Sequence, residues 1–187
     1  MTILSIILLV LAAWLIFTFN GLVGLRNQVA NAFRQIDVQL KRRHDLIPNL
    51  VESVKGEMKF ERETLERVIQ ARAAAMSAGQ GGNMGEILAK EGQLTQALGR
   101  LIALSENYPN LKSNESVKTL MEELTHTENQ IGFSRQFYND VVTKFNTKQQ
   151  VFPTNMFAAL LGFSPSALWE LPADSPEREN VKVNLSI

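Results

Sequence analysis

The chain opens with a long apolar stretch. Between Thr2 and Phe19 nearly every residue is Ile, Leu, Val, Ala, Trp or Phe, and the first charged side chain is Arg26. At about 1.5 Å per residue, a helix of this length covers the hydrocarbon core of a bilayer. We therefore predict a transmembrane anchor in residues 1–25. The residues predicted to be transmembrane include Thr2, Ile7, Leu11, Trp14 and Phe19.

The charges around this stretch predict whether it is cleaved as a signal peptide and how it is oriented in the membrane. A cleavable signal peptide is the weaker interpretation, because no basic residue precedes the apolar run and no small-x-small site follows it. Basic side chains gather on its C-terminal side instead, against a lone Asp37. They are Arg26, Arg34, Lys41, Arg42 and Arg43. The positive-inside rule then places the N-terminus outside and the remaining chain in the cytoplasm.

After the anchor, apolar residues recur every three or four positions, which is the period of a helix packed along one face. The first such stripe consists of Leu22, Leu25, Val29, Ala32, Ile36 and Leu40. It is followed by "KRRHD" (residues 41–45) and Pro48. We interpret this segment as a turn, with Asp45 capping a new helix and Pro48 in the first turn of that helix.

Three further helices follow from the same periodicity. The second runs from Pro48 to about Ala78, where "GQGGNMG" breaks it, and the third runs from near Glu86 to "NYPN". The fourth is capped by Ser113 or Asn114 and extends past Phe145. Short connections favour an up-down arrangement of such helices. The sequence thus predicts an all-α fold, in which a transmembrane helix is continuous with, or closely followed by, a long antiparallel four-helix bundle (residues 26–150), with "KRRHD" at the far tip of the first hairpin.

A second apolar stretch follows the bundle, in residues 151–170. Thr154 or Asn155 can cap a short helix there, and Gly162 can end it. Two interpretations stay open: a lid over the open end of the core, or an interfacial helix lying on lipid. The absence of Lys and Arg favours the lid. The expected membrane-proximal contacts are Met156, Phe157, Leu160, Leu161 and Phe163.

The last segment, residues 171–187, predicts a mobile tail. Its end, "VKVNLSI", alternates with period two and could instead add as a strand to a partner.

Composition leaves little room for chemistry. Lys plus Arg and Asp plus Glu both number 19, so no nucleic-acid partner is expected, and the absence of cysteine excludes thiolate sites. Glu123 to His126 is a lone Glu-x-x-His match, whereas a di-iron bundle needs two. We predict no catalytic residue, no cofactor and no metal ligand. The segment Arg42, Arg43, His44 and Asp45 is a possible partner contact; its simpler interpretation is a hydrated helix tip.

Three long motifs resemble the LemA family of bacterial membrane-anchored helical proteins. They are "LRNQVANAFRQIDVQLKRRHDLIPNLVESVKG", "LTQALGRLIALSENYPNLKSNESVKTLMEELTHTENQIGFSRQFYND" and "FPTNMFAALLGF". Phe33 stands where the family commonly has Trp. The resemblance implies a single N-terminal span in the bacterial inner membrane, a cytoplasmic four-helix bundle and no established enzymatic activity.

Together these observations predict a non-enzymatic scaffold anchored in the lipid bilayer, which self-assembles as a homo-oligomer and organises partners or membrane. One alternative is an adaptor or regulator of a membrane-bound enzyme such as a protease. A remote alternative is a metal-dependent enzyme built in a helical bundle.

Overall fold

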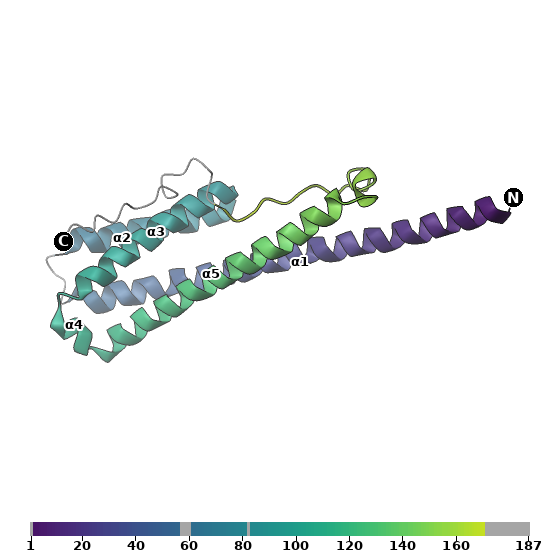
Figure 1. Cartoon of the computed structure of the whole chain (residues 1–187). Helices are drawn as coiled ribbons and strands as arrows, with labels where there is room; N and C mark the ends of the chain where they lie inside the picture. Colours follow the sequence, from purple (N-terminus) through teal and green to yellow (C-terminus); the bar gives the residue numbers. More distant parts are fainter. Residues whose placement is uncertain (1, 57–60, 82, 171–187) are drawn as a thin grey trace, which may run out of the picture. The chain divides into compact units, whose positions relative to one another are not determined.

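The computed structural model describes residues 2–56, 61–81 and 83–170, and the described chain is helical without a strand. The elements are α1 (Thr2–Lys55), α2 (Arg62–Gly81), α3 (Met84–Ser105), α4 (Pro109–Ser113), α5 (Glu115–Gln150) and a short 3₁₀ helix, η1 (Thr154–Met156) (Figure 1). The predicted all-α class is confirmed. The predicted tail or strand in residues 171–187 lies outside the described residues.

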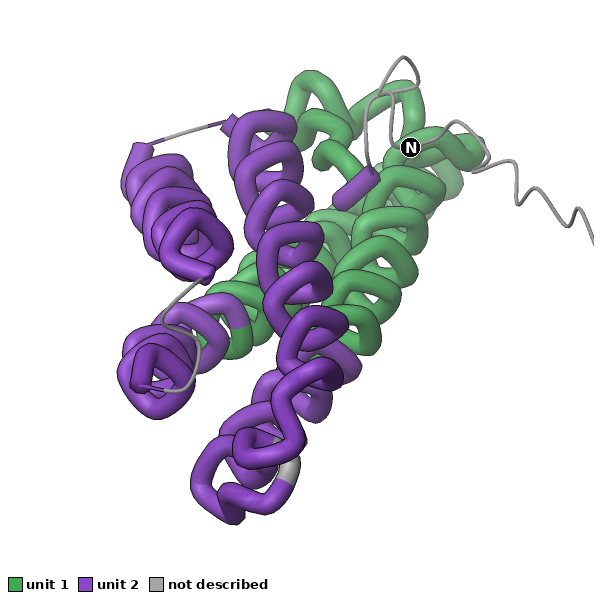
Figure 2. The backbone as a smooth tube through the Cα atoms, turned by 90° about the vertical axis from the view of Figure 1, so that its left-hand side faces the viewer, with its two compact units in different colours: residues 1–39, 130–168 green, residues 40–129, 169–187 purple. Residues whose placement is uncertain are grey.

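The chain divides into two compact units (Figure 2). The described part of unit 1 comprises residues 2–39 and 130–168, and that of unit 2 comprises residues 40–129 and 169–170. Helices α1 and α5 each contribute one end to unit 1 and the other end to unit 2.

Unit 2 holds a helical core made by the end of α1, by α2 and α3, by the short α4, and by the start of α5. Its buried side chains recur at helical spacing, as the sequence predicts: Ile47, Leu50, Val51, Val54, Leu65, Val68, Ala75, Leu94, Leu98, Leu101, Leu111, Val117 and Leu124. The Tyr108 hydroxyl, just beyond α3, lies 3.3 Å from Glu61 Oε1, just before α2. The start of α2 therefore meets the end of α3, so these two helices are antiparallel.

The predicted turn at "KRRHD" is wrong. Helix α1 runs without a break from Thr2 to Lys55, with Pro48 inside it, and α2 begins only at Arg62. The first connection of the bundle therefore follows Lys55, and residues 41–48 form part of a helix instead of a helix tip.

The helix tolerates Pro48 because other contacts offset its cost. A proline inside a helix removes one hydrogen bond and costs about 3 kcal/mol. Ile47, Leu50 and Val54 are fully buried around it. Each such side chain contributes about 1.5–3 kcal/mol, which outweighs the loss at the proline. Pro48 itself faces solvent.

The other helix ends lie close to where turn residues predict them. Asn83 caps α3 by accepting from the Glu86 amide at 2.9 Å. The Asn114 side chain accepts from the amides of Ser116 and Val117 and so caps α5, as one of the two predicted caps. Polar side chains preceding a helix satisfy the amides that its first turn leaves free.

In unit 1, α1 and α5 run antiparallel. Phe33 packs edge-on against Tyr138 with 6.0 Å between ring centroids. Further toward the N-terminus of α1, Leu22 shares a buried cluster with Phe145, which is further toward the C-terminus of α5. Ala158 and Phe163 complete this cluster, so the segment after α5 folds back onto both helices.

Candidate functional site

The apolar end of α1 is the first candidate site. Among the described residues, α1 is the one helix long and apolar enough to cross a bilayer. From Thr2 to Asn20 its side chains are exposed except at Trp14, Leu15 and Thr18. Of the residues predicted to be transmembrane, Ile7, Leu11 and Phe19 are among the exposed large apolar side chains, Thr2 is exposed, and Trp14 is half-buried. A surface of this composition fits hydrocarbon, not water.

The segment after α5 covers one face of this helix. The Phe157 ring packs edge-on against Trp14 at 6.0 Å, and the Phe163 ring packs against Phe19 at 5.6 Å. The Arg26 guanidinium lies over the Phe163 ring, 5.4 Å from its centroid, which is cation–π geometry. Residues 151–163, which we term the apolar loop, therefore lie along α1 from Trp14 to Arg26.

The apolar loop is held by turns in place of the single short helix that the sequence predicts. After η1, Gly162 adopts φ +77°, the Phe163 amide donates to Ala158 O at 3.0 Å, and the Gly162 amide donates to Ala159 O at 3.1 Å. These two bonds form a Schellman motif, which favours glycine at the left-handed position. The role of Gly162 as a terminator is thus confirmed.

The predicted contact residues of the apolar loop separate into two groups. Phe163 is buried and Phe157 half-buried, and both pack toward α1. Met156, Leu160 and Leu161 are exposed. One side of the apolar loop thus covers the core of unit 1, as a lid would, while its other side leaves apolar side chains uncovered.

A buried ionic cluster forms the second candidate site, in unit 2. Arg43 has no exposed surface. Its Nη2 donates to Glu91 Oε2, its Nη1 donates to Glu128 Oε2, and Nη1 also donates to Thr95 Oγ1 at 2.9 Å. Three helices therefore meet at one side chain: α1 supplies the guanidinium, α3 supplies Glu91 and Thr95, and α5 supplies Glu128.

His44 extends this cluster on the other side of Glu91. Its Nε2 lies 3.0 Å from Glu91 Oε1, so the carboxylate is held between two basic side chains. Burial raises the pKa of Glu91, but the close contact with His44 and the charge of Arg43 outweigh it and leave that pKa below its ordinary value. Glu91 is therefore a charged partner of Arg43 at neutral pH.

The structure places the four residues of the predicted partner contact in different surroundings. Arg43 and His44 are buried in the cluster, whereas Arg42 and Asp45 are exposed. Arg42 pairs with Glu123 at 2.5 Å and Lys41 pairs with Asp45 at 2.7 Å. A partner contact at this segment stays a prediction, and Arg42 and Asp45 are the side chains that a partner could reach.

Sequence reasoning missed Glu91, Thr95 and Glu128, and it also missed Arg72 of α2, whose Nε donates to the main-chain carbonyl of His44. A signal for Glu91 is present, because it lies on the same face as Ile87, Leu94 and Leu98, where an apolar residue is expected. Arg43 likewise falls on the stripe of Leu40 and Ile47 once α1 is continuous. Charged residues on two buried stripes predict that the charges meet.

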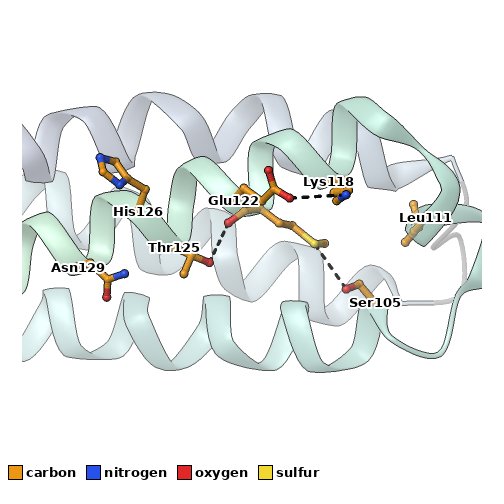
Figure 3. Close-up of a pocket in the computed structure, with 8 residues that line it drawn as sticks. Ser105, Leu111, Lys118, Glu122, Thr125, His126 and Asn129 are labelled. Atoms are coloured by element: carbon orange, nitrogen blue, oxygen red, sulfur yellow. Dashed lines mark hydrogen bonds and ion pairs between the residues drawn. The ribbon is translucent and has the colours of Figure 1, made fainter.

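A groove of about 660 Å³ opens on the surface of unit 2 (Figure 3). It is lined by Ser105, Leu111, Lys118, Met121, Glu122, Thr125, His126 and Asn129. Its polar groups are engaged locally: Lys118 lies 3.9 Å from Glu122, and the Ser105 hydroxyl donates to Ile102 O at 2.6 Å. Within residues 2–56, 61–81 and 83–170, no three His, Asp or Glu side chains gather to hold a metal ion.

The helical fold and the apolar, exposed end of α1 define the class: an all-helical protein associated with a membrane. A model of the LemA family matches residues 32–185, so the chain belongs to the LemA family, as its motifs predict.

Named relatives agree with this assignment. Protein LemA of Metamycoplasma hominis is 28% identical over 89% of this chain and 74% of its own length. Magnetosome protein MamQ 2 of Paramagnetospirillum magneticum is 26% identical over 88% of this chain and 70% of its own length. Magnetosome protein MamQ of Magnetospirillum gryphiswaldense is 24% identical over 80% of this chain and 63% of its own length.

Proposed function

We propose that this protein is a non-enzymatic scaffold anchored in the inner membrane, whose helical bundle associates with further copies and with partner proteins in the cytoplasm. One observation carries the proposal. The helix whose first 20 residues expose apolar side chains continues without interruption to Lys55 and supplies Ile47, Leu50 and Val54 to the core of unit 2. The apolar anchor and one helix of the bundle are thus the two ends of α1.

The interior of unit 2 supports a structural role. Its buried ionic groups, Arg43 and Glu91, pair with each other, while the half-buried Glu128 also binds Arg43 and His44 lies against Glu91. A pair closed in this way has no free acid or base to offer a substrate. Such buried networks also fix the register of packed helices, which is the best-attested use of buried ion pairs.

Self-association is supported by an exposed aromatic pair on α5. Phe133 is 66% exposed and Phe137 is 48% exposed, and their spacing of four residues places them side by side on one helix face. Aromatic side chains are enriched where proteins bind one another and are depleted on free surfaces. A second copy of the chain, with the same pair, would bury both.

An adaptor role is favoured by the groove of Figure 3. Leu111 and Met121 give it an apolar lining, while Lys118, Glu122 and His126 bring polar and charged groups. Apolar grooves of this kind receive one face of an amphipathic helix. We propose the adaptor role as the second function, with a helix of a membrane-bound enzyme as the occupant.

The cytoplasmic orientation rests on the positive-inside rule. It is tested with single cysteines in the otherwise cysteine-free chain, Asn83→Cys and Ser116→Cys. In intact cells, a membrane-impermeant maleimide should leave both unlabelled, and opening the cells should allow both to react. Labelling in intact cells would place these residues outside and exclude cytoplasmic partners.

The scaffold proposal itself is tested by crosslinking in native membranes. We expect a lysine-reactive crosslinker to yield homo-oligomers of the full chain together with a reproducible set of membrane proteins. A chain that stays monomeric at every concentration, with no crosslinked neighbour, would contradict the proposal.

A further inference from the structure

We propose that the apolar loop, residues 151–163, is inserted into the bilayer beside α1 and contacts the acyl chains of the leaflet on the Arg26 side. This inference rests on the proposed membrane anchor and adds a second lipid-binding element to it. It concerns the uncovered side of the apolar loop, which the packing in unit 1 leaves without a protein partner among the described residues.

The level of the apolar loop along α1 determines its depth. Phe157 contacts Trp14, and Phe163 lies under the Arg26 guanidinium. Trp14 and Arg26 are twelve residues apart, which is about 18 Å along a helix. The headgroup layer on each side of a bilayer is about 5–7 Å thick. With the Arg26 charge kept among the headgroups, the contact of Phe157 with Trp14 lies below them, in the hydrocarbon.

The side chains of the apolar loop suit that position. Phe152 is 78% exposed and Leu160 is 83% exposed, and Met156 and Leu161 are exposed beside them. Asn155 is the one polar side chain exposed between Val151 and Leu161. No charged residue occurs between Lys148 and Glu170. Insertion therefore places apolar surface in hydrocarbon and buries no charged side chain there. A charged side chain would be costly to insert and would oppose this position.

Most of the backbone amides in the second part of the apolar loop are hydrogen-bonded within the loop, which lowers the cost of placing it in lipid. Irregular chain in hydrocarbon must satisfy its own amides and carbonyls, because no water is present to do so. Between Asn155 and Phe163, seven amides donate to carbonyls of the same segment: those of Asn155, Met156, Phe157, Ala158, Leu161, Gly162 and Phe163. The Schellman motif at Gly162 supplies two of these bonds. The apolar loop is thus folded on itself, with seven of the nine amides from Asn155 to Phe163 satisfied within the loop.

The covered positions on α1 agree with this arrangement. Within the exposed apolar stretch, Trp14 and Thr18 are shielded, and Leu22 follows them on the same face as a fully buried residue. A spacing of four residues keeps these three side chains on one side of the helix. The remaining surface of α1 is left for lipid, so α1 and the apolar loop form one apolar body within unit 1.

The test uses the full chain in vesicles of phosphatidylethanolamine and phosphatidylglycerol. Since the chain has no cysteine, single variants carry an environment-sensitive NBD label at one position each: Phe152→Cys and Leu160→Cys in the apolar loop, Leu9→Cys on α1, and Ser116→Cys at the start of α5. Leu9 is exposed on the apolar end of α1 and Ser116 is exposed on α5, so they are the lipid and water references. Quenching by doxyl-labelled lipid and by aqueous iodide is measured for each.

We expect labels at positions 152 and 160 to be quenched at least threefold more by doxyl lipid, and threefold less by iodide, than the label at position 116. The unlabelled thiol of Leu160→Cys should also react at least tenfold more slowly with a water-soluble maleimide than that of Ser116→Cys. Because this second measurement uses the protein without a dye, it excludes insertion that the dye itself would cause.

Two different failures are distinguishable. Iodide quenching at positions 152 and 160 equal to that at position 116, with position 9 quenched by lipid, would overturn the insertion of the apolar loop and leave the anchor intact. Iodide quenching at position 9 would contradict the anchor, and the insertion of the apolar loop with it.

Discussion

The Arg72 guanidinium donates from Nε to the main-chain carbonyl of His44 at 2.7 Å. This carbonyl is the one that Pro48 leaves without a helical partner, because proline has no amide hydrogen to donate four residues back. A side chain of α2 thus replaces the hydrogen bond that α1 loses, and the proline becomes a point at which the two helices are joined.

This relationship predicts a coupling between the two residues. Arg72→Met should lower the free energy of unfolding by about 1–3 kcal/mol, the cost of leaving a buried carbonyl unpaired. In a Pro48→Ala background the new amide can bond the His44 carbonyl, so the same change should cost less. Urea unfolding of the full chain in detergent, followed by circular dichroism, measures both. Equal costs in the two backgrounds would show that Arg72 acts independently of the proline.

The buried cluster predicts a strong asymmetry between adjacent arginines. Arg43→Leu leaves the carboxylates of Glu91 and Glu128 without their cation and should cost about 3–5 kcal/mol of stability. Arg42→Leu removes only an exposed pair with Glu123 and should cost less than about 1 kcal/mol, which makes it the matched control.

A compensating variant separates charge from packing at the same site. Replacing Arg43 and Glu91 together by leucine removes both buried charges and should recover part of the loss, because well-packed apolar residues can replace a buried ion pair. A double variant as unstable as the sum of the single changes would indicate that shape, not charge balance, determines stability here.

The lowered pKa of Glu91 predicts that the protein becomes less stable to unfolding as the pH falls into the acid range. A carboxyl whose pKa lies below its ordinary value of 4.5 in the folded state binds fewer protons there than in the unfolded chain. Its contribution is therefore fully present above pH 4.5 and is lost as the pH falls through the lowered pKa. Wild-type protein should exceed Glu91→Gln in stability at pH 7, and the difference should shrink in acid. A difference that stays constant from pH 7 to pH 3 would exclude Glu91 as its source.

Self-association predicts an effect of the exposed pair on α5. Phe133→Ser together with Phe137→Ser should reduce crosslinked homo-oligomer severalfold and leave helicity unchanged. Ile69→Ser, which alters an exposed apolar side chain on α2, serves as the control and should leave crosslinking intact. Loss of oligomer in the control, or its persistence in the double variant, would assign the contact to another surface.

Much of the fold could be predicted from periodicity and turn residues. Of the predicted stripe, Leu22, Ala32, Ile36 and Leu40 are buried and Leu25 and Val29 are half-buried, and Gly162 ends its turn as expected. These features depend on local spacing and backbone preference, which the sequence displays directly.

The continuity of α1 could not be predicted in the same way. A run of charges followed by Pro48 has the composition of a turn, and the residues that overrule this preference lie far along the chain: Glu91, Glu128 and Arg72. Partners separated by 28 to 85 positions leave no local pattern. The position of Glu91 on an apolar stripe was the one available signal.

The central claim is that the first part of α1 lies in lipid as a helix with one face covered. Single spin labels placed in turn from Ile3 to Val23, in vesicles, test it most directly through collision rates with oxygen and with a water-soluble nickel complex. We predict that the collision rate with oxygen exceeds the collision rate with nickel from Ile3 to Phe19. The oxygen rate should be lowest at Trp14, Thr18 and Leu22, where other parts of unit 1 cover the helix. Nickel collisions as frequent as those at an exposed site of α5, without helical periodicity, would contradict the account.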